Sequence, residues 1–110
     1  MSNLAAVTFQ EDADSGVLSA TISGELDLAE SDEIRDSLAA AAANTSCRYL
    51  LVDVSDVTLI DSYAMGALVS ARNSAASVGV TLTLVDPSPP VRKAIEVTGL
   101  ADVFGLTGPR

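Results

Sequence analysis

The sequence predicts one α/β domain over residues 1–110, with a mixed central sheet and helices packed mainly on one face. Two segments, 7–9 and 18–22, alternate apolar and polar residues, as in strands with one buried face. The run 49–54 is almost entirely apolar, which is typical of a strand covered on both faces beside a parallel neighbour. Helically spaced apolar residues follow the second and third of these segments. The predicted order is therefore β-β-α-β-α-β-α.

The first half of the chain contains a predicted hairpin followed by a helix. Turn-forming residues at 11–16 join the two alternating segments. Asp27, followed three residues later by Glu30, resembles a capping box, so a helix is expected to begin there. Asn44 is its expected end.

The second half contains two further β-α units. We expect residues 55–62 to form a long connection in which Leu59 and Ile60 anchor the loop. A helix then runs from Ser62 to Gly79, and a strand follows over 80–84. Pro87, Pro89 and Pro90 break the chain and start a last helix that ends at Gly99, and residues 100–106 are expected to form a tail strand or clasp.

The predicted topology places function at one edge of the sheet. Right-handed crossovers bring the connections 24–27, 54–62 and 86–88 together at the carboxyl ends of the parallel strands. Open α/β sheets usually bind their partners at this edge.

Charge and composition exclude several function classes. Fifteen acidic and six basic residues give a net charge of -9, which disfavours direct contact with nucleic acid or an anionic membrane surface. There is no histidine, and Cys47 is the only cysteine, so no internal disulfide can form and a metal site would have to consist of carboxylates alone. We expect no metal site and no cofactor. No basic and apolar leader and no long apolar stretch is present, which favours a cytoplasmic protein.

Asp61 and Ser62 stand where the second helix is expected to begin. A side chain there lies beside free backbone N–H groups and the positive end of the helix dipole, an environment that favours a phosphate. Ser62 could therefore carry a phosphoryl group without unfolding the chain. The alternative is that Asp61 or Ser62 only caps the helix.

Two separated segments resemble a known family. The segment 51–68, LVDVSDVTLIDSYAMGAL, looks like the signature of STAS domains of the bacterial anti-sigma factor antagonists, and 24–27, GELD, resembles their other recurrent stretch. Tyr63 and Ala64 stand where the family usually has a small hydroxyl residue and a glycine.

The resemblance implies a function and a partner. It implies that Ser62 is phosphorylated by an anti-sigma factor that is itself a serine kinase and supplies ATP and Mg²⁺, and that a serine phosphatase reverses this. The unmodified protein would bind the anti-sigma factor and free the sigma factor. Asp61 would orient the phosphosite. The residues expected to contact the partner are Glu25, Asp27, Asp56, Asp61, Ser62, Tyr63 and Met65.

The chain has no GxxxxGK[ST] loop, so we expect a binding module without catalytic residues, not an enzyme. Two other functions are also compatible with the sequence. It could be a STAS scaffold or transporter-associated subunit that is never phosphorylated. A receiver-like protein with Asp53 as the phosphate acceptor is less well supported, because the sole lysine, Lys93, falls in the last helix.

Overall fold

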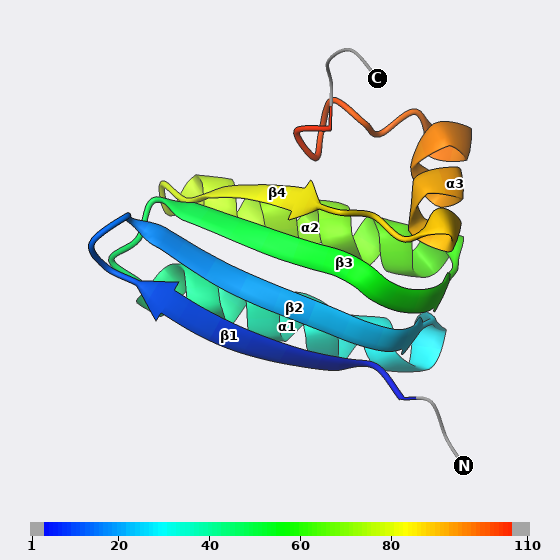
Figure 1. The fold of residues 1–110 in the computed structure, drawn as a ribbon, viewed down its shortest axis with the longest axis horizontal. Helices are drawn as coiled ribbons and strands as arrows, with labels where there is room; N and C mark the ends of the chain where they lie inside the picture. The colour runs from blue at the N-terminus through cyan, green and yellow to red at the C-terminus, as the bar shows by residue number, and fades with distance from the viewer. Residues whose placement is uncertain (1–3, 107–110) are drawn as a thin grey trace.

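The computed structural model describes residues 4–106 and shows seven elements in the predicted order (Figure 1). The elements are β1 (Ala6–Asp12), β2 (Val17–Leu26), α1 (Leu28–Asn44), β3 (Tyr49–Ile60), α2 (Ser62–Ser77), β4 (Thr81–Val85) and α3 (Pro89–Thr98). None of the helices described is long and apolar enough to cross a membrane.

The four strands form one mixed sheet in the order β1-β2-β3-β4. β1 pairs with β2 antiparallel, whereas β2, β3 and β4 run parallel to one another. Helices α1 and α2 lie side by side behind the sheet, and α3 lies at its carboxyl end (Figure 1). The predicted fold class, with a mixed sheet and helices mainly on one face, is confirmed.

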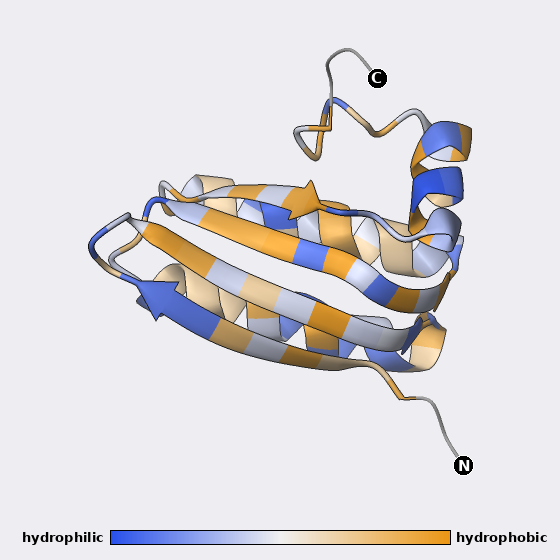
Figure 2. Cartoon of the chain, viewed as in Figure 1, coloured by the Kyte–Doolittle hydropathy of each residue, from blue (hydrophilic) through white to orange (hydrophobic). Residues whose placement is uncertain are grey.

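The core forms between the sheet and the two long helices. In β2 the side chains of Leu18, Ala20 and Ile22 are buried, while the residues between them face outward. Small residues on α2, among them Ala64, Ala71 and Ala75, are also buried, which allows the helix backbone to approach the sheet closely. Apolar residues concentrate in β3 and β4, and hydrophilic residues gather where β1 enters its turn (Figure 2).

The predicted long loop at 55–62 is wrong, because β3 continues to Ile60. Its second half stays paired with β2, with Glu25 opposite Leu59 and Leu26 opposite Ile60. Two register shifts in this pairing, between Thr21 and Ser23 and between Gly24 and Glu25, accommodate the irregular polar pattern. The helix after β3 therefore starts directly from the end of a strand.

The segment 100–106 is a clasp and not a strand. It forms turns along the free edge of β4, where Leu84 N donates to Phe104 O at 3.1 Å. The Phe104 ring is fully buried. This single aromatic anchor holds the clasp on the domain.

Candidate functional site

Asp61 joins the starts of both long helices. Its Oδ1 accepts a hydrogen bond from Ala64 N at 2.8 Å, which caps α2 as the sequence predicted. Its Oδ2 accepts from Leu28 N, the first residue of α1, at 3.0 Å. The first N–H groups of a helix have no partner within the helix. One carboxylate thus satisfies an orphan donor of each helix and fixes their ends relative to each other.

Ser62 is the first residue of α2 and is exposed. Within residues 4–106, no group forms a hydrogen bond with its hydroxyl or its backbone N–H. The hydroxyl therefore faces solvent at the positive end of the helix. It could accept a phosphoryl group without breaking a contact inside the protein.

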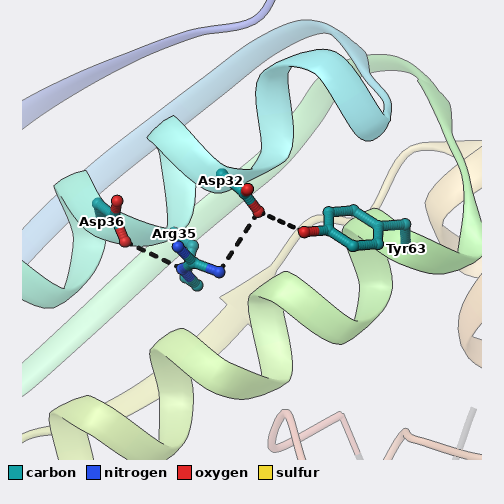
Figure 3. A network of polar contacts seen from close by, with 4 residues as sticks. All are labelled: Asp32, Arg35, Asp36 and Tyr63. Carbon is teal, nitrogen blue, oxygen red and sulfur yellow. Dashed lines mark hydrogen bonds and ion pairs between the residues drawn. The ribbon is translucent and has the colours of Figure 1, made fainter.

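Tyr63 follows directly and reaches across to α1. Its hydroxyl donates to Asp32 Oδ1 at 2.7 Å, and its ring is 44% exposed. Arg35 donates to the same Asp32 oxygen at 3.3 Å and to Asp36 at 2.9 Å (Figure 3). Asp32 raises the pKa of Tyr63 above its usual value of 10.0 in two ways. The hydrogen bond has the larger effect, and the negative charge of Asp32 adds to it. We call these four residues the Tyr63 network.

Glu25 and Asp27 lie at the carboxyl end of β2, next to this junction. Asp27 caps α1, because its Oδ1 accepts from Ala29 N at 3.1 Å and from Glu30 N at 3.3 Å. The predicted capping box is only half formed, since the Glu30 carboxylate does not return a bond to Asp27 N in the described part of the chain. Glu25 is exposed and pairs with Leu59.

The structure does not bring all the predicted contact residues to this surface. Met65 was predicted to contact the partner. It is only 2% exposed and packs in the core, so this prediction is corrected: Met65 is a core residue. Asp56 is exposed and pairs with Ser23 in the middle part of β2, whereas Leu59 and Ile60 at the end of β3 pair with Glu25 and Leu26. Asp61 and Tyr63 flank Ser62 in the chain, and Glu25 and Asp27 lie at the adjoining carboxyl end of β2.

Two apolar residues at this edge were missed. Leu28 is 62% exposed at the start of α1, and its backbone N–H binds Asp61. Leu59 is 44% exposed and lies on β3, so the prediction that it anchors a loop is wrong. Leucines in the first helical turn or the last residues of a strand look like core residues in a sequence, and only the tertiary structure shows that these two are largely exposed within residues 4–106.

Other features of the described chain lie apart from Ser62. Among residues 4–106 there is no group of three or more Asp, Glu, Cys or His side chains placed to hold a metal ion. A cavity of about 580 Å³ lies between α3 and the clasp, lined by Arg92, Ile95, Asp102 and Leu106 among others. None of the predicted site residues lines it.

Comparison with known proteins identifies relatives over nearly the whole chain. The STAS domain family matches residues 8–109. A STAS-domain containing protein of Pseudomonas aeruginosa is 30% identical over 102 residues, which cover 93% of this chain and 99% of that protein. An anti-sigma F factor antagonist of Paenibacillus polymyxa is 27% identical over 91 residues, or 83% of this chain and 78% of that protein.

Solved structures agree with these relatives. The crystal structure of an anti-sigma factor antagonist from Mycobacterium paratuberculosis has a TM-score of 0.73 and 27% identity, covering 90% of this chain and 83% of that one. The phosphorylated form of the Bacillus cell fate determinant SpoIIAA has a TM-score of 0.60 and 25% identity, covering 86% of each chain. The murine anion transporter Slc26a9 shares only the fold, at 20% identity and a TM-score of 0.71, and this match covers 91% of our chain but 19% of the transporter. The match over residues 8–109 shows that the chain belongs to the STAS domain family.

Proposed function

We propose that this protein is an anti-sigma factor antagonist whose binding is switched off by phosphorylation of Ser62. The observation that carries the proposal is the exposed Ser62 hydroxyl, without an internal hydrogen bond among residues 4–106, at the first position of α2. Relatives named as anti-sigma factor antagonists at 27% identity support the role. The SpoIIAA structure in a phosphorylated form supports a covalent switch on this fold.

A phosphate on Ser62 is compatible with the fold. The positive end of the α2 dipole and the free N–H group of Ser62 both favour negative charge there. Asp61 is the immediate neighbour, but both of its oxygens are already bound to backbone N–H groups, which disperse part of its charge. The protein therefore pays little in stability for the modification.

The same phosphate is costly in a complex. Exposed Leu28, Leu59 and Tyr63 lie at the same edge of the sheet as the serine, and an interface that covers this edge would have to desolvate a dianion. If this cost is about 3 to 4 kcal/mol, affinity falls by roughly 10² to 10³. Such a change is large enough to make the anti-sigma factor release the antagonist and bind the sigma factor instead.

In this proposal the partner supplies the phosphoryl-transfer chemistry. The anti-sigma factor acts as the serine kinase and brings ATP and Mg²⁺, and a serine phosphatase restores the unmodified form in the cytoplasm. This chain contributes the acceptor, and Asp61 orients it. Because both Asp61 oxygens are engaged as acceptors, orientation is better supported for this residue than removal of the Ser62 proton.

The proposal is tested by recovering the partner and locating the phosphate. The tagged protein is used to isolate its partner from a native lysate, Mg-ATP is added, and modified peptides are mapped by mass spectrometry. Ser62→Ala should abolish incorporation, whereas Ser74→Ala, an exposed serine further along α2, should not. Ser62→Asp should bind the partner at least tenfold more weakly than the wild type. Phosphate at another residue, or equal binding of Ser62→Asp, would contradict the switch.

A receiver-like acceptor at Asp53 is distinguished in the same experiment. Asp53 lies on β3 between Thr21 and Val85, and its Oδ1 accepts from Ser55 N at 2.8 Å. An acyl phosphate is hydrolysed in mild acid, whereas phosphoserine survives these conditions. Loss of the label under these conditions would favour Asp53.

A second candidate function is a STAS module that binds through the same edge without covalent switching. The Slc26a9 match favours it, because that anion transporter contains this fold within a much longer chain. A partner that binds wild type and Ser62→Asp equally, with no phosphate incorporated, would support this candidate.

A further inference from the structure

Ser62 lies between two residues that are both tied to α1. Asp61, directly before it, binds Leu28 N through Oδ2 at 3.0 Å. Tyr63, directly after it, binds Asp32 Oδ1 through its hydroxyl at 2.7 Å. Leu28 binds through its backbone N–H and Asp32 through its side chain, and the two residues are four positions apart, or about 6 Å along the axis of α1.

Two attachment points constrain the start of α2 more than one does. The first residues of a helix lack intrahelical N–H bonds, and helix ends fray. Asp61 holds the end of α2 through its bonds to Ala64 N and Leu28 N, but neither of these bonds restrains Tyr63 directly. The Tyr63 bond supplies a further attachment on the other side of Ser62, which restrains the backbone that carries the Ser62 side chain.

The Tyr63 bond is itself held in place. Asp32 accepts from both Tyr63 and Arg35, and Arg35 is bound in turn to Asp36 (Figure 3). The raised pKa of Tyr63 agrees with a hydroxyl that donates to a carboxylate. The ring is 44% exposed, so burial alone does not explain its position across the two helices.

From this arrangement we propose that Tyr63 is a positioning residue for Ser62. Its bond to Asp32 holds the first turn of α2 so that the serine hydroxyl is presented to an incoming phosphoryl donor in one orientation. This inference rests on the proposed function, in which Ser62 is the acceptor. Phosphoryl transfer depends mainly on positioning, so a loosely held acceptor reacts more slowly.

The first test measures backbone order without any partner. Nitrogen-15 relaxation should give a Ser62 order parameter near 0.85 in the wild type, falling below about 0.6 in Tyr63→Phe and Asp32→Ala. Asp32→Asn keeps an acceptor oxygen and should restore the wild-type value. Tyr49→Phe is the matched control, because Tyr49 is similarly exposed but its hydroxyl has no partner in the described part of the chain. An unchanged order parameter at Ser62 in Tyr63→Phe and Asp32→Ala would overturn the proposal.

The second test uses the kinase recovered in the previous experiment. Tyr63→Phe should lower kcat for Ser62 phosphorylation about tenfold with KM changed less than twofold, because the ring remains for docking while the tether is lost. Tyr49→Phe should behave as wild type. An equal loss confined to KM would make Tyr63 a contact residue and overturn the positioning role. If the wild type is not phosphorylated at all, the proposed function fails, while the relaxation data still decide whether Tyr63 orders Ser62.

Discussion

The carboxylate of Asp61 accepts a hydrogen bond from the backbone of Leu28, 33 residues earlier in the chain, at 3.0 Å. Its other oxygen caps α2 through Ala64 N. The starts of α1 and α2 are thus held by one side chain, directly before the proposed phosphosite. These two bonds define the structural role of Asp61, and substitution of this residue tests that role.

Asp61→Ala should lower the free energy of unfolding by about 1 to 2 kcal/mol, because it removes a helix cap and leaves Leu28 N without its partner. Urea unfolding at unchanged m-value measures the loss. Asp56→Ala, an exposed carboxylate on β3, is the control and should change stability by less than about 0.5 kcal/mol. Equal stability of the two variants would mean that neither the Leu28 bond nor the Ala64 cap contributes to stability.

The Tyr63 hydroxyl should titrate above pH 10, because its hydrogen bond to Asp32 and the charge of that residue both favour the protonated phenol. A group with a raised folded-state pKa stabilises the fold below its unfolded pKa, and this contribution is lost as pH rises through the folded value. Stability should therefore decline above pH 10 more in the wild type than in Tyr63→Phe. Absorbance titration of Asp32→Ala should show the Tyr63 pKa returning toward 10.0. If the titration is the same with and without Asp32, the bond does not form in solution.

Ser31 and Ser88 are the two buried polar residues of the described core. Alanine substitution at these two positions should have different effects on the stability of the fold. The Ser31 hydroxyl has no hydrogen-bond partner in the part of the chain described, so Ser31→Ala should be neutral or stabilising by up to about 1 kcal/mol. The Ser88 hydroxyl donates to Val57 O at 2.6 Å, so Ser88→Ala should cost about 1 kcal/mol. Thermal unfolding of both variants shows whether Ser88→Ala lowers the melting temperature while Ser31→Ala leaves it unchanged or raises it. A destabilised Ser31→Ala would indicate that an ordered water or another group satisfies that hydroxyl.

Phosphorylation of Ser62 should leave the fold intact. Phosphoserine introduced at position 62 during synthesis should change the free energy of unfolding by less than about 1 kcal/mol, because the helix terminus favours the charge. Denaturant unfolding of the modified and unmodified proteins measures this directly. A loss above about 2 kcal/mol would mean that the modification acts by unfolding the protein, not by blocking an interface.

Much of the fold could be predicted because its signals are local. The alternation in β2, the Asp27 and Asp61 caps and the glycine ends of the helices each depend on residues within about four positions. The extent of β3 could not be predicted in this way. Its second half contains Ser55, Asp56 and Thr58, which resemble a loop, and only pairing with β2 through two register shifts keeps it extended.

The candidate site shows the same division. Ser62 at the start of α2 could be located from a strand followed by a cap, and the structure places it there, exposed. The burial of Met65 and the exposure of Leu59 could not, because both are apolar and their environment depends on which elements cover them.

The sequence by itself determined the order of the elements, the edge of the sheet at which they meet, and the serine that begins the second long helix. It could do so because hydrophobic periodicity and helix capping act between near neighbours in the chain. Only the tertiary structure decided that Asp61 binds Leu28 and that Tyr63 binds Asp32. These partners lie 33 and 31 residues apart, and they meet because α1 and α2 pack side by side on one face of the sheet.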